Sequence, residues 1–341
     1  MKILGFESSC DDTACSVVED GRNILSSVVS SQDDLHRRFG GVVPEVASRE
    51  HIRNVLPVLQ QALDEAEVGW EDLDAVAATR TPGLAGSLLI GFNAARAAAW
   101  ALDVHFVAIN HLDAHVYAAW MHESDPIVPT DIPAVSLVVS GGHTNLYRTG
   151  GPLEHELIGR TVDDAAGEAF DKVAKILHLG FPGGPRIEET AKEGDPEAFD
   201  LPRAMMDGES LDFSFSGLKT AVLYSCVGHN ASMDDIENAQ YDDQFVANMA
   251  ASFQEAVVDV LVGKTALAAD RIGAASVIVG GGVAANGSLR ERMQQMSAEK
   301  GLKLHLAPWP LCRDNAAMVA GVAHVMGREG RWSSLSVDVE P

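Results

Sequence analysis

Residues 2–19 have the sequence KILGFESSCDDTACSVVE, and residues 134–148 have the sequence AVSLVVSGGHTNLYR. Each stretch consists of a mainly apolar run, a turn of small or acidic residues and a second run, which is the pattern of a β-hairpin. The two stretches begin about 130 residues apart. A unit repeated at that distance favours a duplicated αβ domain over two unrelated hairpins.

The rest of the chain alternates between apolar strands and helices. This alternation predicts an α/β fold, and two such halves predict a ligand site in the cleft between them. The segment 186–240 is polar and is predicted to be irregular. Strands are predicted at 75–79, 106–110 and 276–279, and helices at 45–67, 86–102, 111–121, 161–178 and 244–272 and from about 286 and 314 onward.

The length of 341 residues fits two domains of ordinary size. Residues 122–133 are rich in proline and acidic residues, which predicts a linker. We therefore predict a first domain over 1–125 and a second domain over 126–311. A last helix at 312–327 is expected to return to the first domain, and the polar tail 328–341 is expected to be loose.

The chain is strongly acidic, with 25 Lys and Arg against 49 Asp and Glu and a formal net charge of -24. Such a surface repels nucleic acid, so a nucleic-acid ligand would need a local basic patch or a basic partner. The N-terminus lacks a signal-peptide pattern, and no run of about 18 apolar residues suggests a membrane span. The four cysteines form no CxxC pair, which favours reduced thiols. These features predict a cytoplasmic protein that does not enter a membrane.

The segment HLDAH places His111 and His115 one helical turn apart on one face. It follows an apolar strand, and ligands of α/β sheets bind at that end of the strands. These features favour a metal site over a chance pair. The general base of a metalloprotease would stand at Leu112, so that chemistry is disfavoured. Asp314 has the right chemistry for a third ligand, but on sequence alone a helix N-cap is its better interpretation.

Two glycine-rich segments, 138–144 (VVSGGHT) and 280–286 (GGGVAAN), each follow a predicted strand. Their glycines would let backbone N–H groups approach a phosphate closely. The second segment does not match GxGxxG with a downstream acidic residue, so a dinucleotide-binding fold is disfavoured.

Asp164, Glu168 and Asp171 have the spacing of one helical face. They form either a solvated acidic face or a site in which a carboxylate accepts ribose hydroxyls, and the loop 182–185 could cap the sugar. The segment 212–219 (DFSFSGLK) is either an edge strand or a loop that presents its lysine to an anion.

Together these segments resemble the TsaD family, the tRNA adenosine threonylcarbamoyltransferases of the actin, Hsp70 and sugar-kinase superfamily. The resemblance covers about residues 2–325. It implies an α/β fold of two duplicated actin/Hsp70-like (RNase H-like) αβ domains, with the active site in the interdomain cleft. The chain departs from the family at Asp12, where Glu is usual, and at His105, where Pro is usual. The matching segments are 7–13 (ESSCDDT), 41–49 (GVVPEVASR), 110–115 (NHLDAH), 139–144 (VSGGHT), 163–171 (DDAAGEAFD), 182–185 (PGGP), 280–286 (GGGVAAN) and 314–315 (DN).

The resemblance also assigns roles to single residues. It implies one divalent metal ion per subunit, Fe2+ in preference to Zn2+, held by His111, His115 and Asp314. Asp11 matches an acidic residue that is important for activity. The positions that would hold an adenylate are Val138, Val139, Ser140, Gly141, Gly142, Asp171, Gly184 and Asn286.

The reaction implied by the resemblance is transfer of a threonylcarbamoyl group from threonylcarbamoyl-AMP to the exocyclic amine of adenosine 37, with release of AMP. The acceptors are tRNAs that read codons starting with A. The implied partners are a TsaB-like paralogue and a TsaE-like ATPase, and the chain alone could form a homodimer. Three other classes stay open: a phosphotransferase acting on a sugar or small acid, a metalloprotease, and a non-catalytic nucleotide-binding scaffold.

Overall fold

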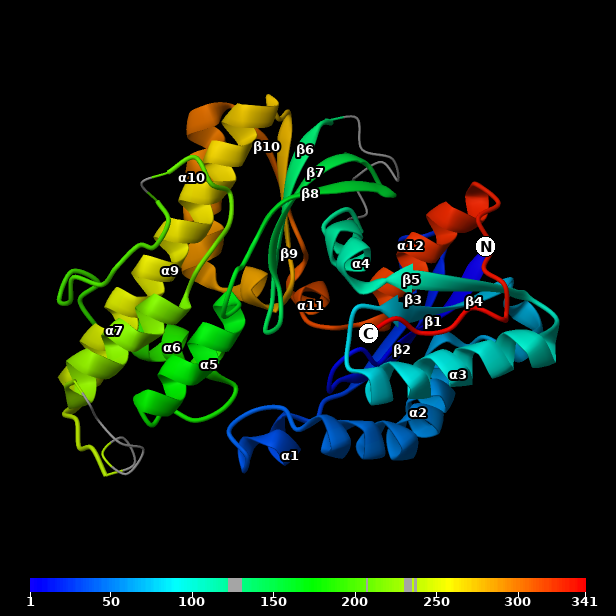
Figure 1. The fold of residues 1–341 in the computed structure, drawn as a ribbon. Helices are drawn as coiled ribbons and strands as arrows, with labels where there is room; N and C mark the ends of the chain where they lie inside the picture. The colour runs from blue at the N-terminus through cyan, green and yellow to red at the C-terminus, as the bar shows by residue number, and fades with distance from the viewer. Residues whose placement is uncertain (122–130, 207, 230–234, 236–237) are drawn as a thin grey trace. The chain divides into compact units, whose positions relative to one another are not determined.

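The computed structural model describes residues 1–121, 131–206, 208–229, 235 and 238–341. The chain forms two compact units, the first made of Met1–Thr130, Gly150–His155 and Ala307–Pro341 and the second of Asp131–Thr149 and Glu156–Leu306. The predicted domain boundary at 125/126 and most of the predicted linker lie outside the described residues. Each unit is built around its own five-stranded sheet (Figure 1).

The strands of the first unit are β1 (Lys2–Glu7), β2 (Thr13–Glu19), β3 (Asn23–Ser30), β4 (Ala75–Thr81) and β5 (His105–Asn110). They form a sheet in the order β3-β2-β1-β4-β5. β1 is antiparallel to β2 and parallel to β4, which is in turn parallel to β5. The carboxyl ends of three neighbouring strands therefore lie at one edge of the sheet.

The helices of the first unit are α1 (Asp33–Arg37), α2 (Pro44–Ala66), α3 (Ala85–Leu102), α4 (His111–Ala118), α11 (Trp309–Cys312) and α12 (Ala316–Arg328), with a 3-10 turn at Trp70–Asp72. α2 and α3 cover one face of the sheet, and α4 and α12 cover the other (Figure 1). Leu4 and Phe6 on β1 belong to the core shared with α2 and α3. Gly5, between them, faces α12, as the two-residue period of a strand requires.

Gly5 determines how closely α12 approaches the sheet. A Cβ atom on Gly5 would lie 2.4 Å from the backbone oxygen of Ala316, in the first turn of α12. Because only glycine lacks this atom, α12 packs directly on β1. This contact places the residues just before α12 over the carboxyl-terminal part of the sheet.

The second sheet consists of β6 (Ala134–Val139), β7 (Thr144–Gly151), β8 (Glu154–Arg160), β9 (Ser276–Gly280) and β10 (Lys303–Leu306), in the order β10-β9-β6-β7-β8. β6 is antiparallel to β7 and parallel to β9, which is parallel to β10. Taken from β8, this is the strand order of the first unit with the same pairing directions around the central strand. The predicted duplication is confirmed.

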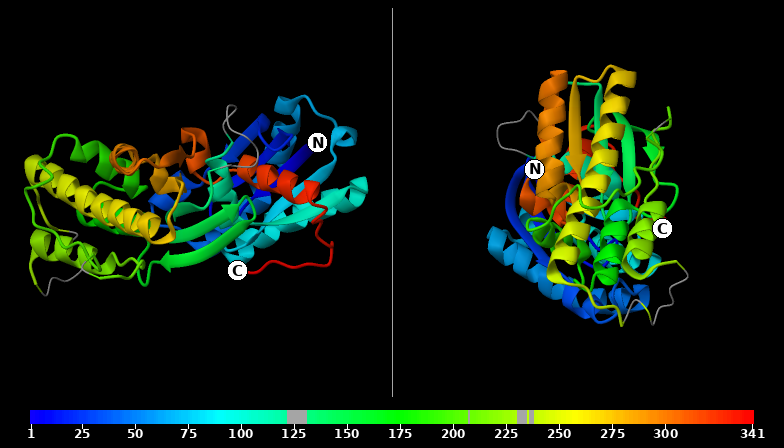
Figure 2. Two further views of the ribbon diagram at one scale, coloured as in Figure 1. Left: turned by 90° about the horizontal axis from the view of Figure 1, so that it is seen from above. Right: turned by 90° about the vertical axis from the view of Figure 1, so that its left-hand side faces the viewer.

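The helices of the second unit are α5 (Ala166–Ile176), α6 (Gly183–Ala191), α7 (Ser216–Val227), α9 (Asp243–Ile272) and α10 (Gly287–Lys300), with a 3-10 turn at Gly282–Ala285. α9 and α10 lie side by side (Figure 2). α9 is long and apolar enough to cross a membrane, but 61% of its most apolar window is buried inside the structure, as in the core helix of a soluble protein.

The structure corrects two expectations about the second unit. The helix predicted at 161–178 begins only at Ala166, because the Thr161 hydroxyl donates a hydrogen bond to the Asp164 carbonyl across a turn. The segment predicted to be irregular, 186–240, contains most of α6 and all of α7.

The tail after α12 is not loose. Ser333 N–H donates to the Phe106 carbonyl over 2.8 Å, and the Ser333 hydroxyl accepts from Ala108 N–H over 2.9 Å. The Trp332 ring stacks on His105, with ring centroids 4.1 Å apart. The tail thus covers the outer edge of β5, which would otherwise carry unpaired backbone groups.

Candidate functional site

Two histidines of the first unit lie on α4 because of the residue that precedes them. Asn110 ends β5, and its side-chain oxygen accepts from Leu112 N–H over 2.8 Å and from Asp113 N–H over 3.3 Å. This N-cap starts α4 directly at the carboxyl edge of the sheet. His111 and His115 then share one face, with ring centroids 4.5 Å apart.

Asp314, in the segment before α12, lies beside these two histidines. Its Oδ1 lies 3.2 Å from Nε2 of His115 and 3.5 Å from Nε2 of His111. The N-cap interpretation of Asp314 is wrong, because the side chain of Asn315 caps α12 by accepting from Met318 N–H over 3.0 Å. Asp314 is thereby left to face the histidines.

The donor atoms of His111, His115 and Asp314 all lie within 4.8 Å of one another. Both histidines are buried, and the carboxylate is 22% exposed. Two imidazole nitrogens and one carboxylate oxygen form a donor set that suits Zn2+ or Fe2+ and leaves coordination positions open. The residues present therefore fit a divalent ion.

A further carboxylate, missed by the sequence analysis, lies behind His111. Glu7 is 1% exposed at the end of β1, and its Oε2 lies 2.9 Å from Nδ1 of His111. Thr79, on the neighbouring β4, donates its hydroxyl proton to the same oxygen over 2.6 Å. The parallel order of β1, β4 and β5 is the signal that could have found this group, since it brings these strand ends together.

The four groups influence one another's protonation. Burial disfavours the charged imidazole of His111, but the carboxylates of Glu7 and Asp314 outweigh it and raise its pKa to about 9. Burial opposes ionisation of Glu7 and Asp314 as well, yet the histidines lower the pKa of both carboxyls. Burial and the neighbouring His111 lower the pKa of His115. In the metal-free chain the two carboxylates therefore stabilise the protonated, positively charged form of His111.

Asp11 lies in the turn between β1 and β2, partly exposed. Burial, and then the charge of Asp314, raise its pKa. Asp12 is buried beside it, and burial raises its pKa to about 7 although Arg313 opposes the shift. A carboxyl with a raised pKa is better matched to proton transfer near neutral pH.

The predicted run Val138–Gly142 forms the end of β6 and the turn after it. The two valines are buried, whereas Gly141 and Gly142 are exposed, and a Cβ atom on either glycine would meet no atom of the described residues within 4 Å. Gly167, in the first turn of α5, donates its N–H to the Ser140 carbonyl over 3.1 Å. The turn therefore offers open backbone next to a helix start, as an anion site requires.

The other predicted residues of the second unit have internal partners. Asp171 accepts from Gly183 N–H over 2.6 Å, which ties α5 to the start of α6, where Gly184 follows. Asn286 caps α10 by accepting from Leu289 N–H over 3.0 Å. Its amide also donates to the Gln254 side chain over 2.7 Å.

Two further contacts bring these loops to the same end of the second sheet. Gly281 has a φ of 96°, and a Cβ there would lie 2.3 Å from the Val139 carbonyl, so 280–286 runs directly against the end of β6. Gly287 N–H donates to the Glu188 side chain over 2.8 Å, which joins the starts of α10 and α6.

The acidic face on α5 is partly neutralised, because Lys172 lies 2.7 Å from Asp164 and 2.9 Å from Glu168. The segment 212–219 is no edge strand. It makes a single bridge, from Phe213 to Thr161, and then enters α7.

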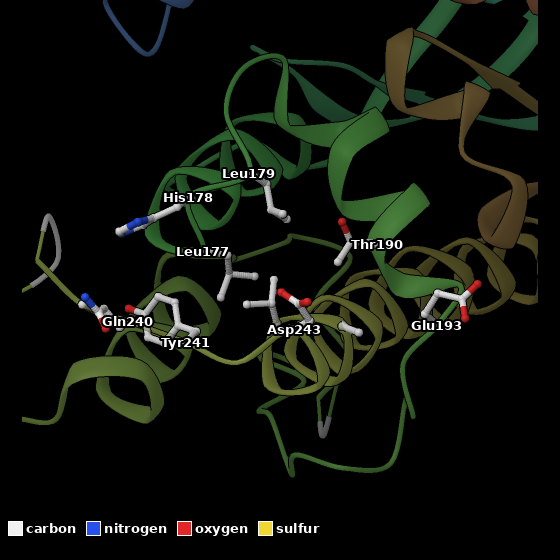
Figure 3. A pocket seen from close by; sticks show the side chains of 11 residues that line it. Leu177, His178, Leu179, Thr190, Glu193, Gln240, Tyr241 and Asp243 are labelled. Carbon is white, nitrogen blue, oxygen red and sulfur yellow. The ribbon is translucent and has the colours of Figure 1, made fainter.

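The second unit also has a cavity of about 670 Å³ (Figure 3). None of the residues predicted to bind a ligand lines it. Figure 3 shows Leu177, His178 and Leu179 on one side and Asp243 on the other. Its lining is Leu177, His178, Leu179, Thr190, Glu193, Ala239, Gln240, Tyr241, Asp243, Val246 and Ala247.

Comparisons with known proteins give one consistent family. The TsaD family model, described as tRNA N6-adenosine threonylcarbamoyltransferase, matches residues 23–321. A protein of that name from Syntrophobacter fumaroxidans is 52% identical over 340 residues, with 100% of this chain and 98% of that protein covered. Another from Symbiobacterium thermophilum is 50% identical over 339 residues, with 99% and 95% covered.

Among solved structures, full-length HypF in its phosphate- and nucleotide-bound form matches with a TM-score of 0.58 at 14% identity, over 97% of this chain and 47% of HypF. Component A of the Acidaminococcus fermentans (R)-2-hydroxyglutaryl-CoA dehydratase matches with a TM-score of 0.52 at 15% identity, over 96% of this chain and 99% of that one. At these identities the likeness concerns the fold alone, and it agrees with the predicted two-domain actin/Hsp70-like fold.

Proposed function

Because the chain belongs to the TsaD family of tRNA N6-adenosine threonylcarbamoyltransferases, and is therefore a tRNA-modifying transferase, we propose a specific reaction for it. The donor is threonylcarbamoyl-AMP. The acceptor is the exocyclic amine of adenosine 37 in tRNAs that read codons starting with A. The observation that supports this proposal most directly is the cluster of His111, His115 and Asp314 in a chain of this family.

In the proposed reaction the amine nitrogen of adenine forms a bond to the carbamoyl carbon. The bond between that carbon and the phosphate oxygen breaks, AMP leaves, and the amine loses one proton. The exposed turn at Gly141 and Gly142 would bind the phosphate through backbone N–H groups. Asp171, Gly184 and Asn286 would line the rest of the adenylate site.

His111, His115 and Asp314 would hold the divalent ion, for which we favour Fe2+ over Zn2+. When bound, such an ion supplies Lewis-acid polarisation of a carbonyl or phosphate oxygen. Asp11 would orient the attacking amine or accept its proton, a role that its raised pKa favours. Leu112, which is buried and apolar, offers no general base at the position a metalloprotease would use.

We further propose that a TsaB-like paralogue and a TsaE-like ATPase assist the reaction in the cytoplasm, and that the chain alone forms a homodimer. The net charge of -24 supports a need for partners, because the chain itself repels a polyanion such as tRNA.

The test is reconstitution with synthetic threonylcarbamoyl-AMP and unmodified tRNA, with and without the two partner proteins. Nucleoside mass spectrometry then detects threonylcarbamoyladenosine. We expect product from the metal-loaded chain with its partners and none from the H111A/H115A double variant. The matched control is H178A, a histidine of the second unit outside the metal cluster, which should retain activity.

Two outcomes would contradict the proposal. Absence of product with all partners and a loaded metal site would favour the scaffold or the phosphotransferase. Full activity of a folded H111A/H115A variant would show that the metal cluster has no part in the reaction.

A further inference from the structure

We propose that Glu7 is a positioning residue for the metal centre, whose carboxylate accepts the Nδ1 proton of His111 and thereby presents the Nε2 lone pair to the ion. This inference rests on the metal site proposed above. It concerns a residue that contacts neither the ion nor the substrate and acts only through His111.

The carboxylate of Glu7 has almost no contact with solvent. The side chain is buried, and a buried carboxylate is costly unless its lone pairs are used. Its Oε1 accepts from Ser9 N–H over 2.5 Å, and its Oε2 accepts from the Thr79 hydroxyl over 2.6 Å. The remaining close partner is Nδ1 of His111, at 2.9 Å from Oε2.

These contacts decide which nitrogen of His111 carries the proton. A carboxylate is an acceptor only, so Nδ1 must be the donor in this pair. The Ser9 hydroxyl is also 3.3 Å from Nδ1, but the bond to the carboxylate is shorter and charge-assisted, and therefore dominates. When an ion replaces the second ring proton, Nδ1 keeps its proton and the lone pair of Nε2 is free for the ion. Nε2 is the nitrogen that lies 3.5 Å from Asp314.

The two histidines differ in this respect. His115 is fully buried, and its Nδ1 has no hydrogen-bond partner among the residues that the structure describes. His111 is therefore the ligand whose ring orientation and basicity are fixed by a neighbour, as is common for metal-bound histidines. The sheet provides this neighbour, because β1 and β5 flank β4 in parallel.

The first experiment measures the affinity for Zn2+ alone, by competition with a chromophoric chelator. The variants are Glu7→Gln and, as the matched control, Thr79→Val, which removes a hydrogen bond to the same oxygen but keeps the carboxylate. We expect Glu7→Gln to weaken Zn2+ binding about 10- to 100-fold, and Thr79→Val to stay close to wild type. Equal weakening in both variants would mean a merely structural role for Glu7 and would overturn the inference.

The second experiment observes the tautomer directly in the wild-type chain. NMR of the Zn2+-loaded wild-type chain with 15N-labelled histidine should show His111 protonated at Nδ1 and metal-bound at Nε2, assigned by comparison with His111→Gln. The opposite tautomer would overturn the positioning role while leaving the metal site intact. Failure of the wild-type chain to bind Zn2+ or Fe2+ would overturn the metal site and the role of Glu7 with it.

Discussion

At the scale of single residues, Asp163 shows how one carboxylate organises a loop. Its Oδ2 accepts from the hydroxyls of Ser214 and Ser216, each over 2.6 Å, and its Oδ1 accepts from Phe215 N–H over 2.9 Å. Burial opposes ionisation, but these hydrogen bonds outweigh it and lower the pKa of Asp163. The loop before α7 is thus held to the segment before α5.

This lowered pKa gives a pH-dependent contribution to stability. A carboxyl with a lowered folded-state pKa stabilises the fold above its unfolded pKa of about 3.9, and the contribution is lost as the pH falls through the folded value. We expect Asp163→Asn to lower the free energy of unfolding by about 1 kcal/mol at pH 7, since the group is partly solvated. The difference from wild type should persist down to about pH 5 and shrink below about pH 4.

Urea unfolding at several pH values measures this difference. Ser214→Ala removes one donor and should show part of the same pH dependence. Ser225→Ala removes a hydroxyl that donates only to the Ala221 carbonyl, so its effect should not change with pH. A constant effect of Asp163→Asn from pH 7 to pH 3 would contradict the argument.

Part of the candidate site was predictable from the sequence. The spacing of His111 and His115 and the open glycines after β6 follow from local pattern, and the structure has them as expected. Glu7 could not be found in this way, because its contact with His111 depends on the order of three strands. Asp314 and Asn315 both suit an N-cap, and only the packing of α12 decides which one caps the helix.

At the scale of elements, the position of α12 depends on a single missing Cβ atom. Gly5→Ala would place a methyl group 2.4 Å from the Ala316 carbonyl, a backbone atom that cannot rotate away. We expect a loss of about 1–3 kcal/mol in stability from overpacking. Because Asp314 lies two residues before the start of α12, Zn2+ affinity should fall as well.

The control for this variant is Gly217→Ala, in the first turn of α7, where a Cβ meets no described atom within 4 Å. It should leave Zn2+ affinity unchanged and stability equal or slightly higher. Thermal unfolding and the Zn2+ competition titration compare the two. Unchanged stability and affinity in Gly5→Ala would show that α12 can shift without cost.

The tail that covers β5 leads to another prediction for an element. Besides the contacts of Ser333, the tail accepts two hydrogen bonds from arginine side chains. Arg80 donates to the Asp338 carbonyl over 2.7 Å, and Arg96 donates to the Val337 carbonyl over 3.0 Å. Removing residues 332–341 should lower stability by roughly 2 kcal/mol or more through these lost hydrogen bonds. It should also expose a strand edge that promotes aggregation.

Light scattering and thermal unfolding of the truncated chain measure these two effects. Trp332→Ala, which removes only the ring stacked on His105, should cost less and should not aggregate. A truncated chain that is as stable and as soluble as the wild type would mean that the tail contributes nothing to the fold.

Some helices and strands could not be predicted from the sequence, for physical reasons. β8 (Glu154–Arg160) is mostly exposed, so it has no alternating apolar pattern. α6 begins within a Pro-Gly-rich segment that resembles a loop. The duplicated hairpins were predictable because their central strands, β1 and β6, are buried on both faces and therefore mainly apolar.

At the scale of the whole molecule, the net charge of -24 must act against the compact state. Like charges repel over a Debye length that falls from about 10 Å at 0.1 M salt to about 3 Å at 1 M. Local ion pairs act in the opposite direction: Arg292 lies 2.5 Å from Glu255 and 2.8 Å from Asp259, and Lys300 lies 2.7 Å from Asp270. These pairs are partly exposed, so each contributes at most about 1 kcal/mol.

Because the acidic residues outnumber the basic ones by 49 to 25, the general repulsion should outweigh the pairs. We therefore expect the melting temperature of the metal-free chain to rise by a few degrees between about 0.05 and 1 M NaCl. In Arg292→Gln the melting temperature should rise more steeply with salt. The variant lacks ion pairs that salt weakens in the wild type and whose loss offsets part of the rise. Differential scanning calorimetry in NaCl and KCl gives the comparison, and a melting temperature that falls with salt would show that the ion pairs, rather than the net charge, dominate the electrostatics of the fold.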